Sequence, residues 1–343
     1  MEVDTEPSAP HRVEELWFED GNLVIQVGNS QFHLYHGILA AHSPVFQDML
    51  SFPQPSNSEL VEGCPLVRIP DAEVEVSDFL KAIFLPEYAT TVPIPHVIIV
   101  GCIRLGHKYK VDYLYCRALI HLSSGYRTSL AEWDSSSYNT DPKTSRPLSE
   151  IKSWPGTTVV AAITCVIQLA REVDALWILP TAFYQLSACF SVPHIGRHIG
   201  MEIFHGTVYN GVPTSLSVQD QQSFLHGHAI HARSAWRIRR FLSDPPSSAL
   251  EGCTSATECA LRRLQAIEID PVSLLASSRP LNAWAGGDWD LLENVCPACL
   301  SVLRTTHADA RQALWDKLPS MYGLPSWEEL ERMKVAAIGT PFL

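Results

Sequence analysis

The chain has 343 residues, a length that predicts about two domains. Apolar residues make up 46% of it and charged residues 18%, which predicts a globular protein with a substantial core and excludes a chain that is disordered throughout. The net charge of −12 argues against nucleic acid or an anionic membrane as the main partner, since both need clustered positive charge.

The cellular compartment is inferred from targeting signals and cysteines. No secretory signal opens the chain, and no apolar stretch reaches the roughly 18 residues that a membrane helix needs. The nine cysteines are spread along the sequence rather than gathered in a disulfide framework. We therefore expect an intracellular protein of the cytoplasm or nucleus, with most cysteines reduced in the core.

The N-terminal part is predicted to mix short strands with helices. Two runs, Leu23–Val27 and Gln31–Tyr35, flank a Gly-Asn-Ser turn and predict a hairpin. Ser43 followed by Pro44 predicts a capped helix that ends near Leu50. The other expected elements are a strand at 66–69 and helices at about 36–41, 77–84, 96–107 and 111–123.

Composition shifts set the expected domain boundaries. Residues 1–15 are predicted to be a disordered tail, and no clear apolar strand precedes Phe18. Residues 133–155 hold six serines and three prolines without hydrophobic periodicity, which predicts a linker at 127–156. This linker would separate an α+β domain at 16–126 from a mainly helical domain at 157–343 that has a soft break at 243–252.

Beyond the linker, apolar spacing predicts almost only helices. Val159, Ile163 and Val166 recur at helical intervals. Ser217 is expected to cap a long helix that a Pro-Pro pair at 245–246 ends. Ser-x-x-Glu capping boxes at 255–258 and 326–329 begin two further helices.

The stretch from Phe18 to about Tyr126 resembles a BTB/POZ domain. The resemblance rests on the family's order of hairpin, capped helix, strand and helices, and on the segments 20–25 (DGNLVI), 32–36 (FHLYH), 38–50 (ILAAHSPVFQDML) and 104–116 (RLGHKYKVDYLYC). It implies a BTB/POZ fold at the N-terminus and a non-enzymatic protein–protein interaction module that self-associates or binds a scaffold. The helical remainder is similar to the C-terminal halves of BTB proteins in the expanded families of mushroom-forming fungi.

The resemblance also implies a candidate protein-binding site. Some BTB proteins are substrate adaptors of cullin-based ubiquitin ligases and carry a hydrophobic-x-Glu signal in the loop before the next strand. Leu60-Val61-Glu62 matches it on a predicted mobile loop at 51–65, with Leu60 as an exposed anchor and Glu62 as the orienting carboxylate. The alternative is a solvated acidic loop.

Two departures from the family weaken the expectation of a homo-oligomer, which stays open. No clear apolar strand precedes Phe18, whereas some relatives exchange such a strand across a dimer. The Tyr-x-Tyr-x-Gly stretch of many animal members is replaced by Phe84–Tyr88 (FLPEY), whose proline disfavours a paired central strand.

Four cysteines of the last third form two pairs, Cys253 with Cys259 and Cys296 with Cys299. Both pairs are predicted at helix starts, and four thiolates suit a tetrahedral structural zinc ion. His307 is set aside as a ligand, because on a continuous helix it would lie about 12 Å beyond Cys299. Two alternatives stay open: small residues packed between helices, and a thiol redox protein that uses Cys296 and Cys299, whose Cys-Pro-x-Cys form resembles a glutaredoxin-type centre.

The remaining motifs point to protein partners. Arg233, Arg237, Arg239 and Arg240 form a basic run at the end of the long predicted helix, either a solvated end that complements the helix dipole or a site for phosphate or an acidic partner. No dinucleotide, phosphate-loop, nucleophile-elbow or zinc-protease motif occurs. We therefore expect a protein without enzymatic activity that binds neither nucleic acid nor a membrane.

Overall fold

The computed structural model describes residues 9–52, 59–85, 87–88, 94–135, 159–189, 202–246, 252–269 and 279–339. The chain divides into two compact units. Unit 1 is built mainly from the residues up to Gly125, and unit 2 from Tyr126 to Gly339 apart from residues 210–212.

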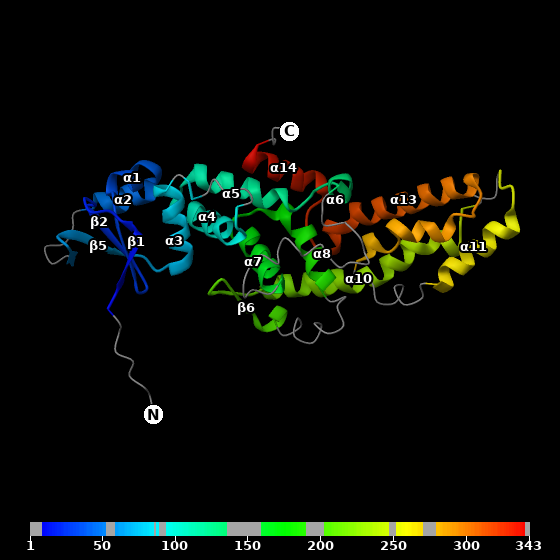
Figure 1. The fold of residues 1–343 in the computed structure, drawn as a ribbon, viewed down its shortest axis with the longest axis horizontal. Helices are drawn as coiled ribbons and strands as arrows, with labels where there is room; N and C mark the ends of the chain where they lie inside the picture. Colours follow the sequence, from blue (N-terminus) through cyan, green and yellow to red (C-terminus); the bar gives the residue numbers. More distant parts are fainter. Residues whose placement is uncertain are drawn as a thin grey trace, which may run out of the picture. The chain divides into compact units, whose positions relative to one another are not determined.

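Unit 1 contains a mixed sheet, whose strands are drawn in blue in Figure 1. The strand order is β1-β3-β2-β5-β4. β2 (Leu23–Val27) and β3 (Ser30–Leu34) form the predicted antiparallel hairpin, and Gly28 takes a φ of 54° in its turn. β5 (Cys64–Arg68) lies parallel to β2. β4 (Leu60–Val61) pairs antiparallel with β5 and is an edge of the sheet.

The first strand corrects the predicted extent of the disordered tail. β1 (His11–Trp17) pairs parallel with β3, so the disordered tail predicted through residue 15 is wrong over the described residues, and a strand that is not apolar precedes Phe18. Only Leu16 of this strand is fully buried. Pairing with the edge of β3 holds a charged segment in place, and a periodicity of apolar residues cannot reveal such a strand.

The described residues of unit 1 also form the helices α1 (His36–His42), α2 (Pro44–Ser51), α3 (Glu73–Phe84), α4 (His96–Tyr109) and α5 (Asp112–Ser124). The predicted cap of α2 is confirmed, because the Ser43 hydroxyl oxygen accepts a hydrogen bond from the Phe46 backbone N–H at 3.0 Å. The same hydroxyl donates to the Tyr109 carbonyl, which ties α2 to α4. α4 and α5 approach closely at Gly106, where an added Cβ would lie 3.1 Å from the Tyr115 nitrogen.

Unit 2 is mainly helical, which confirms the predicted fold class of an α+β N-terminal part followed by a helical part. Among the helices in its described residues are α6 (Leu130–Ser135), α7 (Val159–Glu172), α8 (Leu179–Cys189), α10 (Val218–Ser243), α11 (Ala256–Ile269), α13 (Pro297–Met321) and α14 (Trp327–Ile338). Three 3-10 helices, η3 (Leu176–Ile178), η5 (Pro280–Asn282) and η6 (Gly286–Leu292), and a hairpin of β6 (Thr207–Tyr209) and β7 (Val212–Thr214) were not predicted. No helix in the described ranges is both long and apolar enough to span a membrane.

The predicted linker begins too early. α6 lies inside the range 127–156, and Trp133 on it is buried, with its ring edge-on to that of Tyr184 at 5.4 Å. Asp134 forms an ion pair with Arg311 of α13 at 2.5 Å. These distant partners hold α6 in the core, although its serine-rich surroundings resemble a linker. Residues 136–158, which carry most of the predicted linker, lie outside the described residues.

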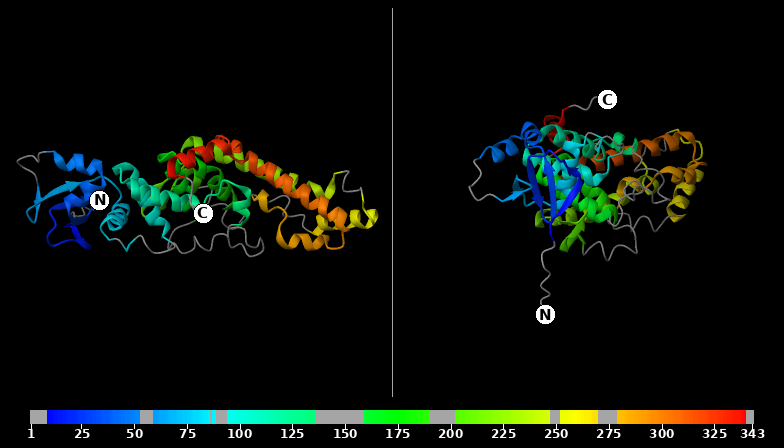
Figure 2. Two further views of the ribbon diagram at one scale, coloured as in Figure 1. Left: turned by 90° about the horizontal axis from the view of Figure 1, so that it is seen from above. Right: turned by 60° about the vertical axis from the view of Figure 1, so that its left-hand side comes forward.

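The core of unit 2 is organised around α10 and α13, which run side by side (Figures 1 and 2). Tyr322, just beyond α13, is fully buried, and its hydroxyl is hydrogen-bonded to His231 Nε2 of α10 at 2.9 Å. Its ring stacks on Phe183 of α8 at a centroid distance of 4.9 Å. Gly227 of α10 makes room for this ring, because an added Cβ would lie 2.0 Å from Tyr322 Cε1.

Candidate metal centre

Cys253, Cys259, Cys296 and Cys299 come together in unit 2. Their sulfur atoms all lie within 4.8 Å of one another, and the sulfurs of Cys253 and Cys296 are 3.9 Å apart. With zinc–sulfur bonds of about 2.3 Å, a regular tetrahedron places its sulfurs about 3.8 Å apart. The four thiols therefore fit a tetrahedral ion after a small contraction.

Local structure explains how each pair forms. Gly252, with a φ of 80°, turns the chain before Cys253, and Cys259 lies near the start of α11. Cys296 is the N-cap residue of α13, and Pro297 occupies its first position. Cys299 follows within the first turn. Both pairs thus lie at helix starts, as the spacing predicted.

Helix dipoles and backbone hydrogen bonds favour the thiolate form of the partly exposed Cys296. The two helix N-termini bring positive backbone dipoles to the sulfurs. The Cys296 backbone N–H donates to the Cys259 sulfur at 3.3 Å. Hydrogen bonds from the backbone of Cys299 and Thr254 lower the pKa of Cys296 to about 6.

The two buried thiols, by contrast, favour the neutral form. Burial raises the pKa of Cys259 and that of Cys299, because a lone thiolate is poorly solvated in an apolar core. A divalent cation would supply the positive charge that ionises them. Four protein ligands would complete the tetrahedron and leave no open position, which is the arrangement of structural rather than catalytic zinc.

The cysteine cluster is part of an apolar core in unit 2. Cys259 and Cys299 are buried together with Phe241, Trp284 and Leu303, whereas Cys253 and Cys296 are partly exposed. The Arg263 guanidinium lines the same small cavity and donates to the Leu242 carbonyl at 2.9 Å. Sequence reasoning missed Arg263, since nothing in its local pattern marks it as a neighbour of the cysteines.

The arrangement of the four cysteines favours neither of the two alternatives, packing of small residues between helices or thiol redox chemistry. Packing of small residues requires each thiol to contact apolar neighbours, but it does not require four sulfurs to converge from separate segments. The Cys-Pro-x-Cys motif follows η6 rather than a strand, and so lacks the βαβ setting of a glutaredoxin-type centre.

His307 lies on the uninterrupted α13 and contacts the rings of Phe241 and Trp289, each at a centroid distance of 5.4 Å, instead of the cysteine cluster.

The second predicted site lies in unit 1. Leu60 is 59% exposed on the edge strand β4, and Glu62 occupies the following turn with a φ of 52°. The Glu62 carboxylate forms an ion pair with Arg12 of β1 at 2.5 Å, a partner that the sequence did not reveal. The predicted mobile loop at 51–65 is wrong at both ends, because Ser51 ends α2 and the β4–β5 hairpin begins at Leu60. Residues 53–58 lie outside the described residues.

Comparison with known proteins identifies unit 1. Residues 18–124 match the family model of the BTB/POZ domain. No curated protein and no solved structure matches the chain. The matched range contains the β2–β3 hairpin, the capped helix α2 and the helices α4 and α5. The chain therefore carries an N-terminal BTB/POZ domain, a protein-interaction module, followed by a mainly helical unit.

Proposed function

We propose that this protein is a non-enzymatic adaptor whose BTB domain docks on a cullin-type scaffold and whose helical unit holds a second partner. The observation that carries the proposal is a BTB domain that presents Leu60, 59% exposed, on an edge strand beside Glu62. Full burial of a leucine side chain contributes about 1.5–3 kcal/mol, and an edge strand offers unpaired backbone groups beside it.

The Glu62 carboxylate is available to a partner despite its ion pair. The side chains of Arg12 and Glu62 are 48% and 43% exposed. An exposed pair contributes only about 0–1 kcal/mol, so exchanging Arg12 for a charge on a scaffold costs little.

Self-association through the BTB domain is the alternative within the same class. β1 already pairs with β3 of its own chain, so a dimer formed by strand exchange must first give up this pairing. A homo-oligomer formed through other surfaces needs no such step.

Calorimetry of the full chain with a cullin N-terminal domain tests the adaptor role. We expect a Kd of about 1–10 μM, at least tenfold weaker for Leu60→Asp with Glu62→Lys. Glu59→Lys is the matched control, since Glu59 adjoins Leu60 and is paired with Arg68 on the exposed surface. Absence of binding, or equal binding by the double variant, would contradict the proposal. Light scattering on the same samples would then report self-association.

We further propose that the four cysteines hold one structural zinc ion. The convergence of the sulfurs, the two helix starts and the backbone donors support this proposal. Metal analysis of the purified chain is expected to give about one equivalent of zinc, and cobalt substitution an absorption spectrum typical of tetrahedral thiolate.

Cysteine variants locate the ion. Cys299→Ser should lose the metal and the cobalt spectrum. Cys189→Ser changes another buried cysteine of unit 2 outside the cluster, and should retain both. A folded protein that contains no metal after purification with zinc present would rule out the site.

A further inference from the structure

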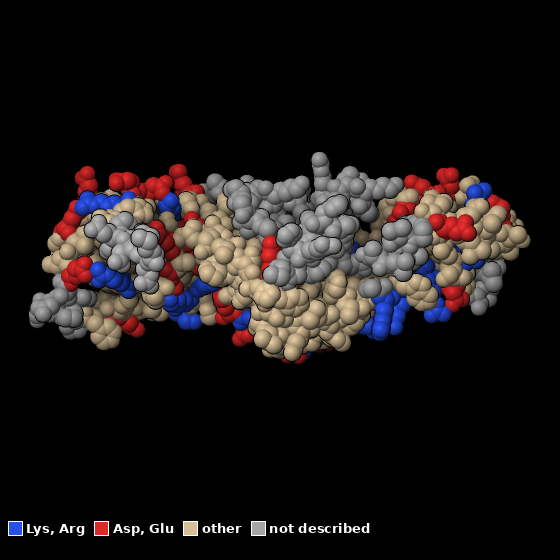
Figure 3. Space-filling view, turned by 90° about the horizontal axis from the view of Figure 1, so that it is seen from below, with Lys and Arg blue, Asp and Glu red and all other residues tan. Residues whose placement is uncertain are grey.

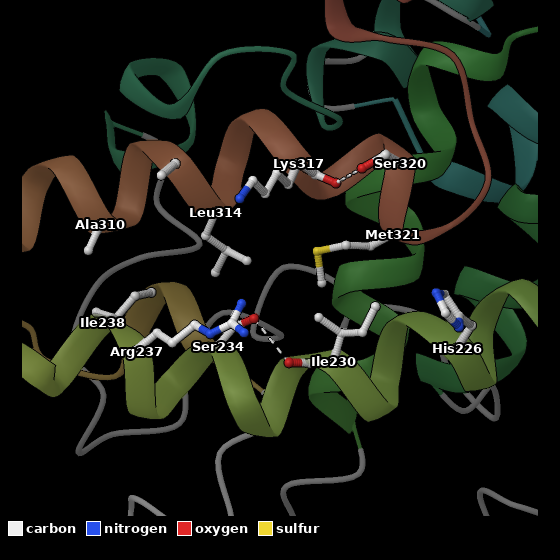
Figure 4. A pocket seen from close by; sticks show the side chains of 11 residues that line it. His226, Ile230, Ser234, Arg237, Ile238, Ala310, Leu314, Lys317, Ser320 and Met321 are labelled. Carbon is white, nitrogen blue, oxygen red and sulfur yellow. Dashed lines mark hydrogen bonds between the residues drawn. The ribbon is translucent and has the colours of Figure 1, made fainter.

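A groove of about 430 Å³ runs between α10 and α13 in unit 2 (Figure 4). Its floor is apolar: Ile230 and Ile238 of α10 face Leu314 and Met321 of α13. Ile238, Leu314 and Met321 are buried. The groove lies within one compact unit.

The dimensions of the groove suit an elongated occupant. Its lining residues run from His226 to Ile238 on α10 and from Ala310 to Met321 on α13. At 1.5 Å per residue these stretches are about 18 Å and 17 Å long, or about three helical turns. Ala310 and Ala313 carry small side chains on the α13 side, which allow another backbone to come close. A third helix is the element that fills such a space between two helices.

The charges at the groove have one sign. Arg237 and Lys317 extend into it from facing helices, and none of the described residues that line it is acidic (Figure 4). Within the described part of the chain neither of these two side chains forms an ion pair, and both are exposed. On a protein of net charge −12 the basic rim stands out. Figure 3 shows Lys and Arg side chains on the surface of the helical unit, with Asp and Glu side chains among them. Such a rim attracts carboxylates.

We propose that this groove binds an acidic amphipathic helix of a partner protein. Apolar side chains at positions i, i+3 or i+4 and i+7 of that helix would cover the apolar floor of the groove. Its flanking Asp or Glu would pair with Arg237 and Lys317. The inference rests on the proposed function in so far as the helical unit is the part that holds a second partner. It is independent of any cullin contact.

A displayed peptide library tests the proposal on the full chain. Its members are 15-residue helices with varied apolar residues at helical spacing and with acidic, neutral and basic flanks in equal proportion. We expect the enriched sequences to have an apolar face with Asp or Glu on its flanks. An enriched peptide, labelled and measured by fluorescence anisotropy, should bind more weakly as salt is raised.

Charge reversal locates the site. Arg237→Glu with Lys317→Glu should weaken the acidic peptide at least tenfold and improve binding of its lysine-flanked counterpart. Arg233→Glu is the matched control, because Arg233 is exposed one turn from Arg237 on α10 and does not line the groove. It should change binding less than threefold.

Three outcomes would overturn the inference. They are the absence of enriched sequences, enrichment without a charge preference, and binding that the double variant leaves unchanged. The Leu60→Asp, Glu62→Lys protein should bind the same peptide as tightly as the unaltered chain. Failure of the cullin experiment and failure of the groove are therefore distinguishable.

Discussion

A buried histidine couples the stability of the helical unit to pH. Burial, and secondarily the charge of Arg311, lowers the pKa of His307 to about 4, against 6.5 for an exposed histidine. Between these values the unfolded chain binds the proton more readily than the fold does, so the free energy of unfolding falls as the pH drops from 6.5 towards 4. The expected loss between pH 7 and 5.5 is about 1 kcal/mol.

Denaturant unfolding at pH 7 and pH 5.5 checks this prediction. His307→Phe keeps an aromatic ring against Phe241 and removes the titrating group. Its free energy of unfolding should change about 1 kcal/mol less between the two pH values than that of the unaltered chain, with zinc kept in excess in both. Equal changes would show that His307 does not set the pH dependence.

Two glycines in helices should respond to alanine in opposite directions. Gly227→Ala would place a Cβ 2.0 Å from the Tyr322 ring, and the forced repacking should lower the free energy of unfolding by about 2 kcal/mol. Gly37→Ala in α1 meets no atom within 4 Å and should raise it by about 0.5–1 kcal/mol. Thermal melting of both variants checks the pair, and a loss at position 37 equal to that at 227 would contradict the packing argument.

Among the helices with a serine N-cap, the contribution of the cap to the free energy of unfolding should depend on its burial. Ser43 is 1% exposed and joins the start of α2 to the Tyr109 carbonyl, so Ser43→Ala leaves buried polar groups without partners. We expect a loss of about 2 kcal/mol in the free energy of unfolding. Ser326→Ala at the exposed start of α14 should cost about 0.5–1 kcal/mol, because water replaces the serine oxygen as the acceptor of the Glu329 backbone N–H. Equal losses in urea unfolding would show that burial does not matter at these caps.

At the scale of the whole molecule, the two units should respond differently to loss of metal. The cysteine cluster and its apolar surroundings belong to unit 2, and the BTB domain has its own core. A chelator should therefore increase hydrogen exchange in α11 and the first turns of α13 and leave α4 and α5 unchanged. Exchange measured by mass spectrometry on the full chain checks this. Uniform change along the chain, or none, would contradict it.

The likeness of the helical unit to the C-terminal halves of fungal BTB proteins stays a prediction, as does the intracellular location. The BTB match covers unit 1 alone. The partner of the helical unit must therefore be sought by experiments on its own surfaces.

The sequence by itself determined the elements whose signals are local. The turn at Gly28 and the caps at Ser43, Ser217 and Ser326 depend on neighbouring residues, and the structure has each of them. The same holds for the pairing of Cys296 with Cys299 at the start of α13, because a spacing of one helical turn places both on one face.

Tertiary structure decided what depends on distant partners. β1 exists because β3 offers an edge to a charged strand, and α6 is held by Tyr184 and α13 rather than by its own pattern. Two cysteine pairs 37 residues apart meet because α11 and α13 share an apolar core, and the groove exists because α10 and α13 run side by side. Local propensity specifies helices and turns, but only side-chain packing across the chain specifies which of their faces meet.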